Sequence, residues 1–198
     1  MAKVVAAITM SVDGYITGPE DGPGKGLGEG GERLHYWVFG GPWSYGNEPK
    51  GGPTGTDAEY LDEMMARGGA TVIGRNMYEA AEHWGDKSPF GVPVFVVTHR
   101  PEEEPDTGEF TFVGDFEEAI ERAQAAAGGK DVSIGGGASV IRQGLDAGLV
   151  DELHLIVAPV ILGAGKHLFA DFTKSLDLEN LRVRQSPWAT FIEFAVKR

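Results

Sequence analysis

Asp131-Val-Ser-Ile-Gly-Gly-Gly-Ala-Ser-Val140 is the stretch that decides the fold. An apolar strand runs into three glycines, and a helical pattern with apolar residues at 140, 141 and 145 follows at once. Only glycine lets a backbone turn this tightly at positive φ and come within contact of a ligand. A glycine turn that leads into a helix N-terminus also favours anions, because free N–H groups and the helix dipole both attract negative charge. The stretch therefore predicts a site for a phosphate-bearing ligand such as a nucleotide; a tight strand-to-helix turn without a ligand is the alternative.

Composition limits the classes of protein that the chain can represent. With 198 residues, of which 41% are hydrophobic, it is expected to form one domain with a packed core over residues 1–198. The net charge of −13 disfavours binding to nucleic acid or to anionic membranes. The chain has no cysteine, so disulfides and thiolate chemistry are excluded. No signal pattern and no apolar run of membrane-spanning length occur, so we expect a cytoplasmic protein.

The order of strand and helix patterns predicts an α/β fold. Apolar runs at 4–10, 70–74, 93–98 and 132–134 have the near-continuous apolar character of strands that are buried on both faces. Capping boxes at 56–59 and 115–118 predict the starts of two helices between these runs. Consecutive strands follow at 151–158, 181–186 and 189–196. This order predicts a mostly parallel central sheet with antiparallel C-terminal strands at one edge. The apolar stripe of the first helix, with Met64 and Met65, is interpreted as core filling.

A long insertion at about 17–55 is rich in glycine and aromatic residues. So many aromatic side chains are unusual in a disordered linker, and long ordered loops are often binding loops or lids. A flap that packs on the core or on a second subunit is the alternative. Residues 26–31 match the pattern G-x-G-x-x-G formally, but no strand directly precedes them, so the match is attributed to chance.

Polar and glycine residues follow three of the predicted strands. Arg75 comes after one strand, Thr98, His99 and Arg100 after the next, and the glycine triplet after a third. Ligands of open α/β sheets collect outside the carboxyl ends of strands. The arginines offer bidentate forks for phosphate, so the three sites together could surround a dinucleotide. Alternatively, each arginine is a surface charge at a strand end.

Metal and nucleophile signals are missing from the sequence. The five histidines lack paired ligand spacing, and no G-x-S-x-G pattern occurs, so we expect no metal site and no serine hydrolase. His154 lies in the middle of a predicted strand and is interpreted as structural.

The whole chain resembles the dihydrofolate reductase-like family, and most closely the reductase domain of riboflavin biosynthesis with its stand-alone bacterial relatives. The resemblance implies a three-layer dihydrofolate reductase-like fold. The order and spacing of several motifs carry it: Ser11-Val-Asp-Gly-Tyr-Ile-Thr-Gly18, Val72-Ile-Gly-Arg-Asn-Met-Tyr-Glu79, Val94-Phe-Val-Val-Thr-His99, Ile134-Gly-Gly-Gly-Ala138, residues 143–155, Pro159-Val-Ile-Leu-Gly-Ala-Gly165 and Leu168-Phe169.

The resemblance implies NADPH as the cofactor and assigns residues to its parts. Gly74, Arg75, Asn76 and Met77 would hold phosphates or ribose, and Thr98, His99 and Arg100 would face the 2′-phosphate. Gly135, Gly136, Gly137 and Ala138 would cradle the pyrophosphate with Ser139, the first two glycines being joined by a cis peptide. Ala7, Ile8 and residues 13–16, including Ile16, would line the nicotinamide.

The sequence departs from that family where the substrate binds. Folate reductases carry a carboxylate on a helix soon after the first loop, and no acid of this chain matches it by spacing. The catalytic residues therefore stay unassigned, with Asp13, Glu32 and Asp57 as candidates. The fused zinc-binding deaminase domain of the riboflavin enzymes has no counterpart in this chain.

Two functions follow from these patterns. The first is an NADPH-dependent oxidoreductase of the dihydrofolate reductase or 5-amino-6-(5-phosphoribosylamino)uracil reductase type. It would transfer a hydride to a pterin, pyrimidine or quinone-like ring in a flat apolar pocket. The wall of this pocket would be formed by His35, Trp37, Phe39, Trp43 and Tyr45. The alternative is a non-catalytic protein that binds NADPH or an aromatic small molecule. A homodimer is expected in either case.

Overall fold

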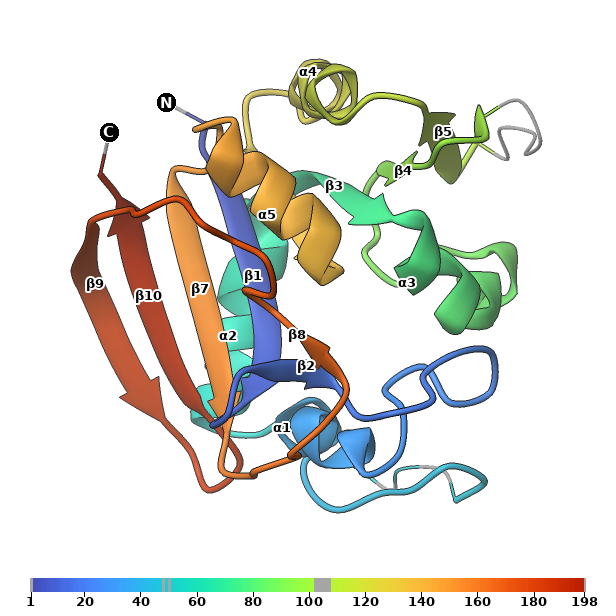
Figure 1. Cartoon of the computed structure of the whole chain (residues 1–198), viewed down its shortest axis with the longest axis vertical. Coiled ribbons are helices and arrows are strands. Elements are labelled where there is room, and N and C mark those ends of the chain that lie inside the picture. The colour runs from blue at the N-terminus through green and yellow to red at the C-terminus, as the bar shows by residue number, and fades with distance from the viewer. Residues whose placement is uncertain (1, 48, 50, 102–107, 198) are drawn as a thin grey trace.

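The computed structural model describes residues 2–47, 49, 51–101 and 108–197, and its centre is an eight-stranded sheet (Figure 1). The strand order is β5-β4-β3-β6-β1-β7-β10-β9. Every neighbouring pair from β5 to β7 is parallel, and β10 is antiparallel to both of its neighbours. The predicted α/β class, with a mostly parallel sheet and antiparallel C-terminal strands, is confirmed. The strands are β1 (Val4–Ser11), β3 (Gly68–Gly74), β4 (Val94–Val97), β5 (Phe110–Val113), β6 (Asp131–Gly136), β7 (Glu152–Ala158), β9 (Leu178–Gln185) and β10 (Thr190–Val196).

Helices cover both faces of the sheet and complete three layers (Figure 1). The helices α4 (Phe116–Ala126) and α5 (Ala138–Asp146) pack on one face, where Phe116 and Ile141 join Val72 and Ile134 in the largest apolar cluster. The helices α2 (Thr56–Arg67) and α3 (Arg75–Ala80) lie on the opposite face. Because successive strand residues point to opposite faces, Val72 packs beneath α4 and α5, whereas its neighbour Ile73 packs near α3.

The structure confirms the side-chain cap at one of the two predicted helix starts. Asp115 caps α4 and accepts a hydrogen bond from Glu118 N at 2.9 Å. The predicted start of α2 is correct, but its predicted cap is wrong, because Gly55 rather than Thr56 is the cap and no side chain caps the helix. Gly55 has a φ of 53°, a conformation that favours glycine, and it lets Thr56 adopt helical geometry as the first residue of the helix.

The aromatic insertion is built of short ordered pieces. It runs from β2 (Tyr15–Thr17), which pairs with β8 (Lys166–His167), through the 3₁₀ helix η1 (Gly31–His35) to α1 (Tyr36–Phe39). Trp37 is buried and makes edge contacts with the rings of Tyr60 and Phe191, so this part of the insertion belongs to the core. Residues 48 and 50 of the insertion lie outside the described residues.

The G-x-G-x-x-G match lies in turns that lead into η1, and no strand directly precedes it, as expected. A Cβ on Gly28 would lie 2.3 Å from Gly18 O, and Gly28 has a φ of 71°, so the close approach of these two segments requires glycine at this position. In the described part of the chain, no helix combines the length and the apolar character needed to cross a bilayer.

Candidate functional site

A cleft of about 1460 Å³ follows the carboxyl ends of β3, β4 and β6 and continues between α2 and the sheet. The strand order makes β3 the neighbour of both β4 and β6, so the three ends lie side by side. Of the segment 13–16 that was expected at the nicotinamide, Asp13, Gly14 and Tyr15 are not in the lining of this cleft. The other residues predicted to bind the cofactor do line it: Ala7, Ile16, Gly74, Arg75, Asn76, Met77, Thr98, His99, Arg100, Gly135, Gly136, Gly137, Ala138 and Ser139. Ile8, which the resemblance places with them, lines it too.

The buried hydroxyl of Thr98 connects two of the strand ends. It accepts a hydrogen bond from Arg75 Nη1 at 3.3 Å and another from Arg100 N at 3.2 Å. Arg75 also donates through Nε to Glu79 at 2.6 Å, an i,i+4 pair within α3. These bonds fix the guanidinium of Arg75 beside the residue that follows β4. Thr98 is therefore a positioning residue for the rim of the cleft.

The cleft carries more positive than negative charge, in contrast to the chain as a whole. Its charged lining residues among those described are the cations Arg75, Arg100, Arg142 and Lys166 and the acids Asp21 and Asp115. Asp21 forms an ion pair with Lys166, and Asp115 is the cap of α4. The net charge of the protein is −13. An anionic ligand would therefore be attracted to this cleft in particular.

The glycine triplet leads from β6 into α5, as the sequence predicts: Gly135 and Gly136 end the strand, and Gly137 is the N-cap of the helix. The cis peptide joins Gly136 to Gly137, so the expected position between Gly135 and Gly136 is wrong. The turn comes one residue later because β6 stays paired with β3 as far as Gly136, opposite Ile73. Gly136 has a φ of 128°, and a Cβ there would lie 3.2 Å from Met77 Sδ and 3.4 Å from Ile8 Cδ1. The absence of a side chain thus leaves room where three segments meet.

The three candidate acids are not among the residues that line the cleft. Asp13 accepts hydrogen bonds from Leu162 N at 3.0 Å and Gly163 N at 2.7 Å, so it ties two loops together. A hydrogen bond from Ser11 and those two backbone bonds lower the pKa of Asp13 to about 2. Asp57 is buried at the start of α2, and burial raises the pKa of its carboxyl. Glu32 lies in η1.

The predicted substrate residues His35, Trp37 and Phe39 do line the cleft. Trp37 Nε1 donates to Thr9 Oγ1 at 3.1 Å, which fixes the indole against β1. Surrounding protein atoms shield the imidazole of His35 from water, and this desolvation lowers its pKa to about 4. His35 is therefore neutral near pH 7.

The sequence did not predict the wall that α2 contributes. Leu61, Met64 and Met65 line the cleft. Met64 also packs against the buried cluster of Trp37 and Tyr60, as expected of a core residue, whereas Met65 is 50% exposed, so the interpretation of Met65 as core filling is wrong. Thr9, Thr71 and Ser133 belong to the same lining. An apolar stripe on a helix shows only that one face avoids water; it does not distinguish a covered core from an apolar binding wall.

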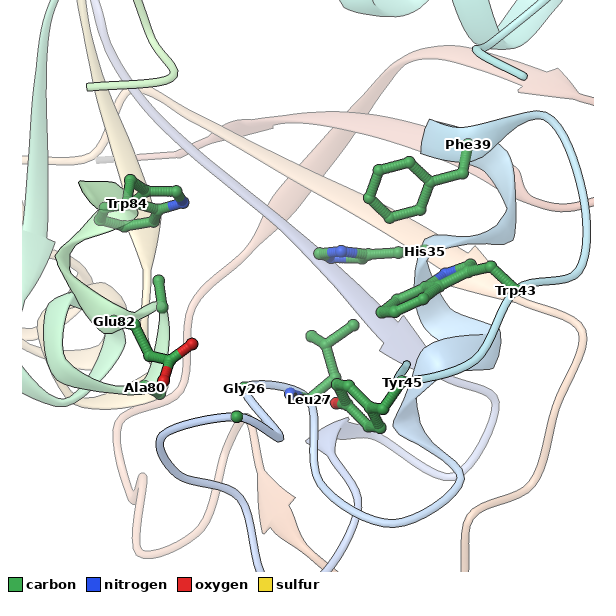
Figure 2. Close-up of a pocket in the computed structure, with 11 residues that line it drawn as sticks. Gly26, Leu27, His35, Phe39, Trp43, Tyr45, Ala80, Glu82 and Trp84 are labelled. Atoms are coloured by element: carbon green, nitrogen blue, oxygen red, sulfur yellow. Dashed lines mark hydrogen bonds between the residues drawn. The ribbon is translucent and has the colours of Figure 1, made fainter. Parts of the chain in front are cut away.

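A second, smaller cavity of about 300 Å³ borders the cleft (Figure 2). The two share Leu27, His35, Phe39, Trp84 and three small residues of the lining. Trp43, Tyr45 and Glu82 line the smaller cavity alone. We call this space, with its lining residues, the aromatic chamber.

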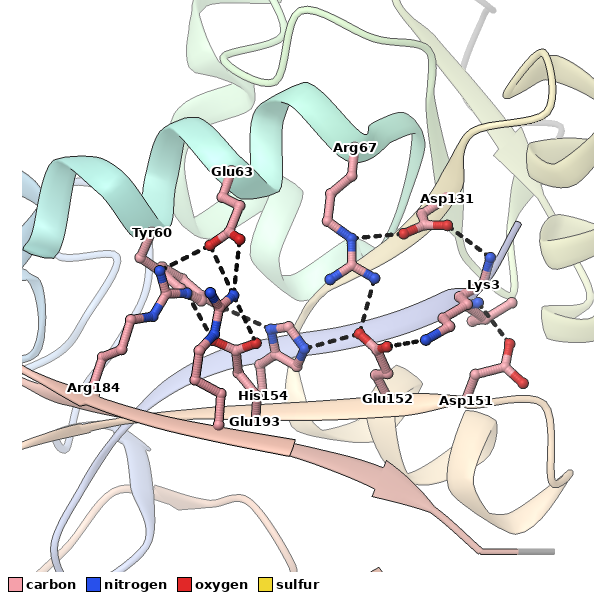
Figure 3. Close-up of polar contacts among 12 residues, drawn as sticks. Lys3, Tyr60, Glu63, Arg67, Asp131, Asp151, Glu152, His154, Arg184 and Glu193 are labelled. Atoms are coloured by element: carbon pink, nitrogen blue, oxygen red, sulfur yellow. Dashed lines mark hydrogen bonds and ion pairs between the residues drawn. The ribbon is translucent and has the colours of Figure 1, made fainter. Parts of the chain in front are cut away.

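His154 belongs to a polar network on the α2 side of the sheet (Figure 3). Its Nδ1 lies 3.2 Å from Tyr60 OH, and its Nε2 lies 3.2 Å from Glu152 Oε2. Arg67 and Lys3 donate to the same glutamate. Burial raises the pKa of Glu152, but the bonds from Lys3 and Arg67 outweigh it and lower the pKa to about 2. The interpretation of His154 as structural agrees with these contacts. Among the described residues no group of three or more His, Cys, Asp or Glu is placed to hold a metal ion.

The chain belongs to the RibD C-terminal domain family, whose model matches residues 2–191. A segment of 56 residues is 45% identical to the uncharacterised Bacillus subtilis (strain 168) protein YyaP, and it covers 28% of this chain and 30% of that relative. Among solved structures, a protein of Shewanella sp. PV-4 named for riboflavin biosynthesis is 26% identical over the full length of both chains, with a TM-score of 0.71. Dihydrofolate reductase from Enterococcus faecalis, solved with NADP(H) and RAB-propyl, shares the fold at 15% identity, with a TM-score of 0.62 over 99% of this chain and 97% of that one.

Proposed function

We propose that the protein is an NADPH-dependent reductase that transfers a hydride to a small heterocyclic or aromatic substrate. The convergence of Arg75, Arg100 and the glycine triplet on one cleft of a strongly acidic protein carries the proposal. Membership of the RibD C-terminal domain family supports it, as does the fold shared with a dihydrofolate reductase that binds NADP(H).

The residues of the cleft suit the parts of this cofactor. NADPH, when bound, supplies the hydride, whereas the protein supplies binding and orientation. The turn at Gly136 leaves open the space that a pyrophosphate needs, since a Cβ would fill it. The guanidinium of Arg75 and the side chain of Arg100 would bind phosphate, with Thr98 holding the first in place. Ala7 and Ile16 would lie against the nicotinamide.

Calorimetric titration of NADPH and NADH into Arg100→Ala tests the assignment. Arg100 is proposed to face the extra phosphate of NADPH, and a lost charge-assisted bond is worth roughly 1.5–3 kcal/mol. NADPH should therefore bind roughly 10- to 150-fold more weakly, with NADH little changed. Arg122→Ala is the control, because this substitution also removes one positive charge, but Arg122 lies on α4 and is not in the lining of the cleft. Equal weakening of both nucleotides would contradict the assignment of Arg100.

A non-catalytic nucleotide-binding protein is the second candidate, and the position of the acids favours it. Asp13, Glu32 and Asp57 are outside the lining of the cleft, so none of the candidate proton donors faces a bound substrate there. Incubation with NADPH and a panel of pterins, pyrimidines and quinones distinguishes the two functions. A reductase lowers the reduced-nicotinamide absorbance with at least one acceptor, whereas binding without any loss of absorbance would support the second candidate.

We further propose a homodimer that forms through the face of β9 and β10 opposite to α2. Arg182, Arg184 and Glu193 point toward Glu63 of α2, so their neighbour Val183 lies on the other face, paired with Ile192. Val183 is 59% exposed, and no helix covers this face in Figure 1. Sedimentation velocity tests the dimer. A cytoplasmic location and a single domain over residues 1–198 remain predictions from the sequence.

A further inference from the structure

The aromatic chamber lies between two walls from distant parts of the chain (Figure 2). One wall comes from the insertion and contains His35, Phe39, Trp43 and Tyr45. The other comes from the end of α3 and the following turn η2 (Glu82–Asp86), with Ala80, Ala81, Glu82 and Trp84. Since its lining overlaps with that of the cleft, one ligand could occupy both spaces.

The rings of the first wall hold one another in place. Phe39 and Trp43 meet edge to face at 5.1 Å between centroids, and Trp43 and Tyr45 meet in the same way at 5.4 Å. The hydroxyl of Tyr45 accepts a hydrogen bond from Leu27 N at 2.8 Å, which orients that ring. The wall is therefore ordered before any ligand arrives, which lowers the entropy cost of binding.

The second wall is held by an uncommon backbone conformation. Glu82, His83 and Trp84 have φ values of 48°, 59° and 49°, in the left-handed region that side chains other than glycine rarely adopt. Trp84 is anchored by stacking on Phe110, at 6.2 Å between centroids, and by an edge contact with Phe90. Backbone strain of this kind persists where the surrounding structure fixes it and is concentrated at functional sites.

The charge in the chamber differs from that of the strand ends. No lysine or arginine is among its lining residues, and Glu82 is the charged group among them. The low pKa of His35 keeps that imidazole uncharged near neutral pH. A phosphate in the chamber would meet one carboxylate and no cation, at a desolvation cost that nothing there offsets.

We infer that the aromatic chamber binds an uncharged aromatic tail of the substrate and disfavours a phosphorylated sugar tail. The reducible ring would lie in the adjoining cleft, against Leu61 and Met64, which is the part of the inference that rests on the proposed function. The volume of about 300 Å³ is about twice the roughly 150 Å³ that holds a benzene ring, so a substituted phenyl group or a two-ring system fits.

Binding of 2-phenyl-1,4-benzoquinone is compared with that of 1,4-benzoquinone by tryptophan fluorescence and calorimetry, with and without NADPH. The protein cannot form thiol adducts with the quinones, because the chain has no cysteine. An aromatic contact contributes roughly 0.5–1.5 kcal/mol, so two or three ring contacts should make the phenyl compound bind roughly fivefold or more tightly. Trp43→Ala should remove most of that preference, whereas Trp43→Phe, which keeps a ring, should retain it.

Charge gives a second, independent readout. The wild-type protein should bind 5-amino-6-(5-phosphoribosylamino)uracil more weakly than the phenyl quinone, and Glu82→Lys should strengthen binding of the phosphorylated compound. Tighter binding of the phosphorylated compound by the wild type, or the same phenyl preference in Trp43→Ala as in the wild type, would overturn the inference. Failure of this inference can be distinguished from failure of the proposed function. If the proposed function is wrong, the protein does not bind or oxidise NADPH. The preference for the phenyl compound is measured separately, on the protein without NADPH.

Discussion

Replacing Glu152 with glutamine should make the stability of the protein less sensitive to acid. The Glu152 side chain is 5% exposed and accepts bonds from Lys3 and Arg67. These bonds lower its pKa from 4.5 to about 2 in the folded state. A carboxyl whose pKa is lower when folded stabilises the protein fully above the unfolded value of 4.5, and this contribution is lost as the pH falls toward about 2.

The size of the effect follows from the same contacts. A pKa difference between 4.5 and about 2 corresponds to about 3 kcal/mol of unfolding free energy. Water screens part of this interaction, because the side chains of Lys3 and Arg67 are 48% and 29% exposed. After this correction we expect about 1–2 kcal/mol at neutral pH.

Urea unfolding of the wild type and Glu152→Gln, from about pH 7 to about pH 2.5, measures the effect. The difference in unfolding free energy should be largest above the unfolded pKa and should shrink steadily below it. Glu179→Gln is the control, because Glu179 pairs with Lys197 at 3.6 Å and both side chains are more than half exposed. A difference that stays constant over the whole pH range would refute the reasoning, since it would reflect packing and not ionisation.

Three further predictions concern the turn, the dimer and a helix cap. Gly136→Ala should weaken NADPH binding at least tenfold in calorimetry, because the added Cβ approaches Met77 and Ile8 at an unfavourable φ; Gly22→Ala, where no atom lies within 4 Å, should have no effect. Val183→Glu should convert the proposed dimer to a monomer in sedimentation velocity, with the Tm of the monomer little changed, and a wild type that sediments as a monomer would dismiss that interface. Asp115→Ala should cost about 1 kcal/mol in urea unfolding through loss of the bond to Glu118 N, and Asp115→Asn should restore most of it.

The sheet could be predicted because its signals are local. The runs that became β1, β3 and β4 are nearly continuous in apolar residues, as expected of strands with helices on both faces. Once the sheet is parallel, the carboxyl ends of neighbouring strands meet at one edge. For this reason Arg75, Thr98 and the glycine triplet line one cleft, although 61 residues lie between Arg75 and Gly137 in the sequence.

The features that escaped prediction depend on distant partners. Asp13 is acidic and near the first strand, but backbone N–H groups 149 and 150 residues away take up its oxygens. The position of the cis peptide depends on how far β6 pairs with β3. Met65 looked like a core residue because a helical stripe does not reveal what faces it. Each of these features depends on contacts between segments that are distant in the sequence, so it could be identified only in the folded structure.

The strand order has a practical consequence for labelling. Five strands lie between β4, which leads to Thr98, and β9 at the other edge of the sheet. A substitution on β9 is separated from the rim of the cleft at Arg75 and Arg100 by these five strands, so it should leave the structure of that rim unchanged. Because the chain contains no native thiol, one cysteine placed on the outer edge of β9 would be a unique attachment point for a fluorophore or spin label. A probe there could report on association of the protein without touching the cleft.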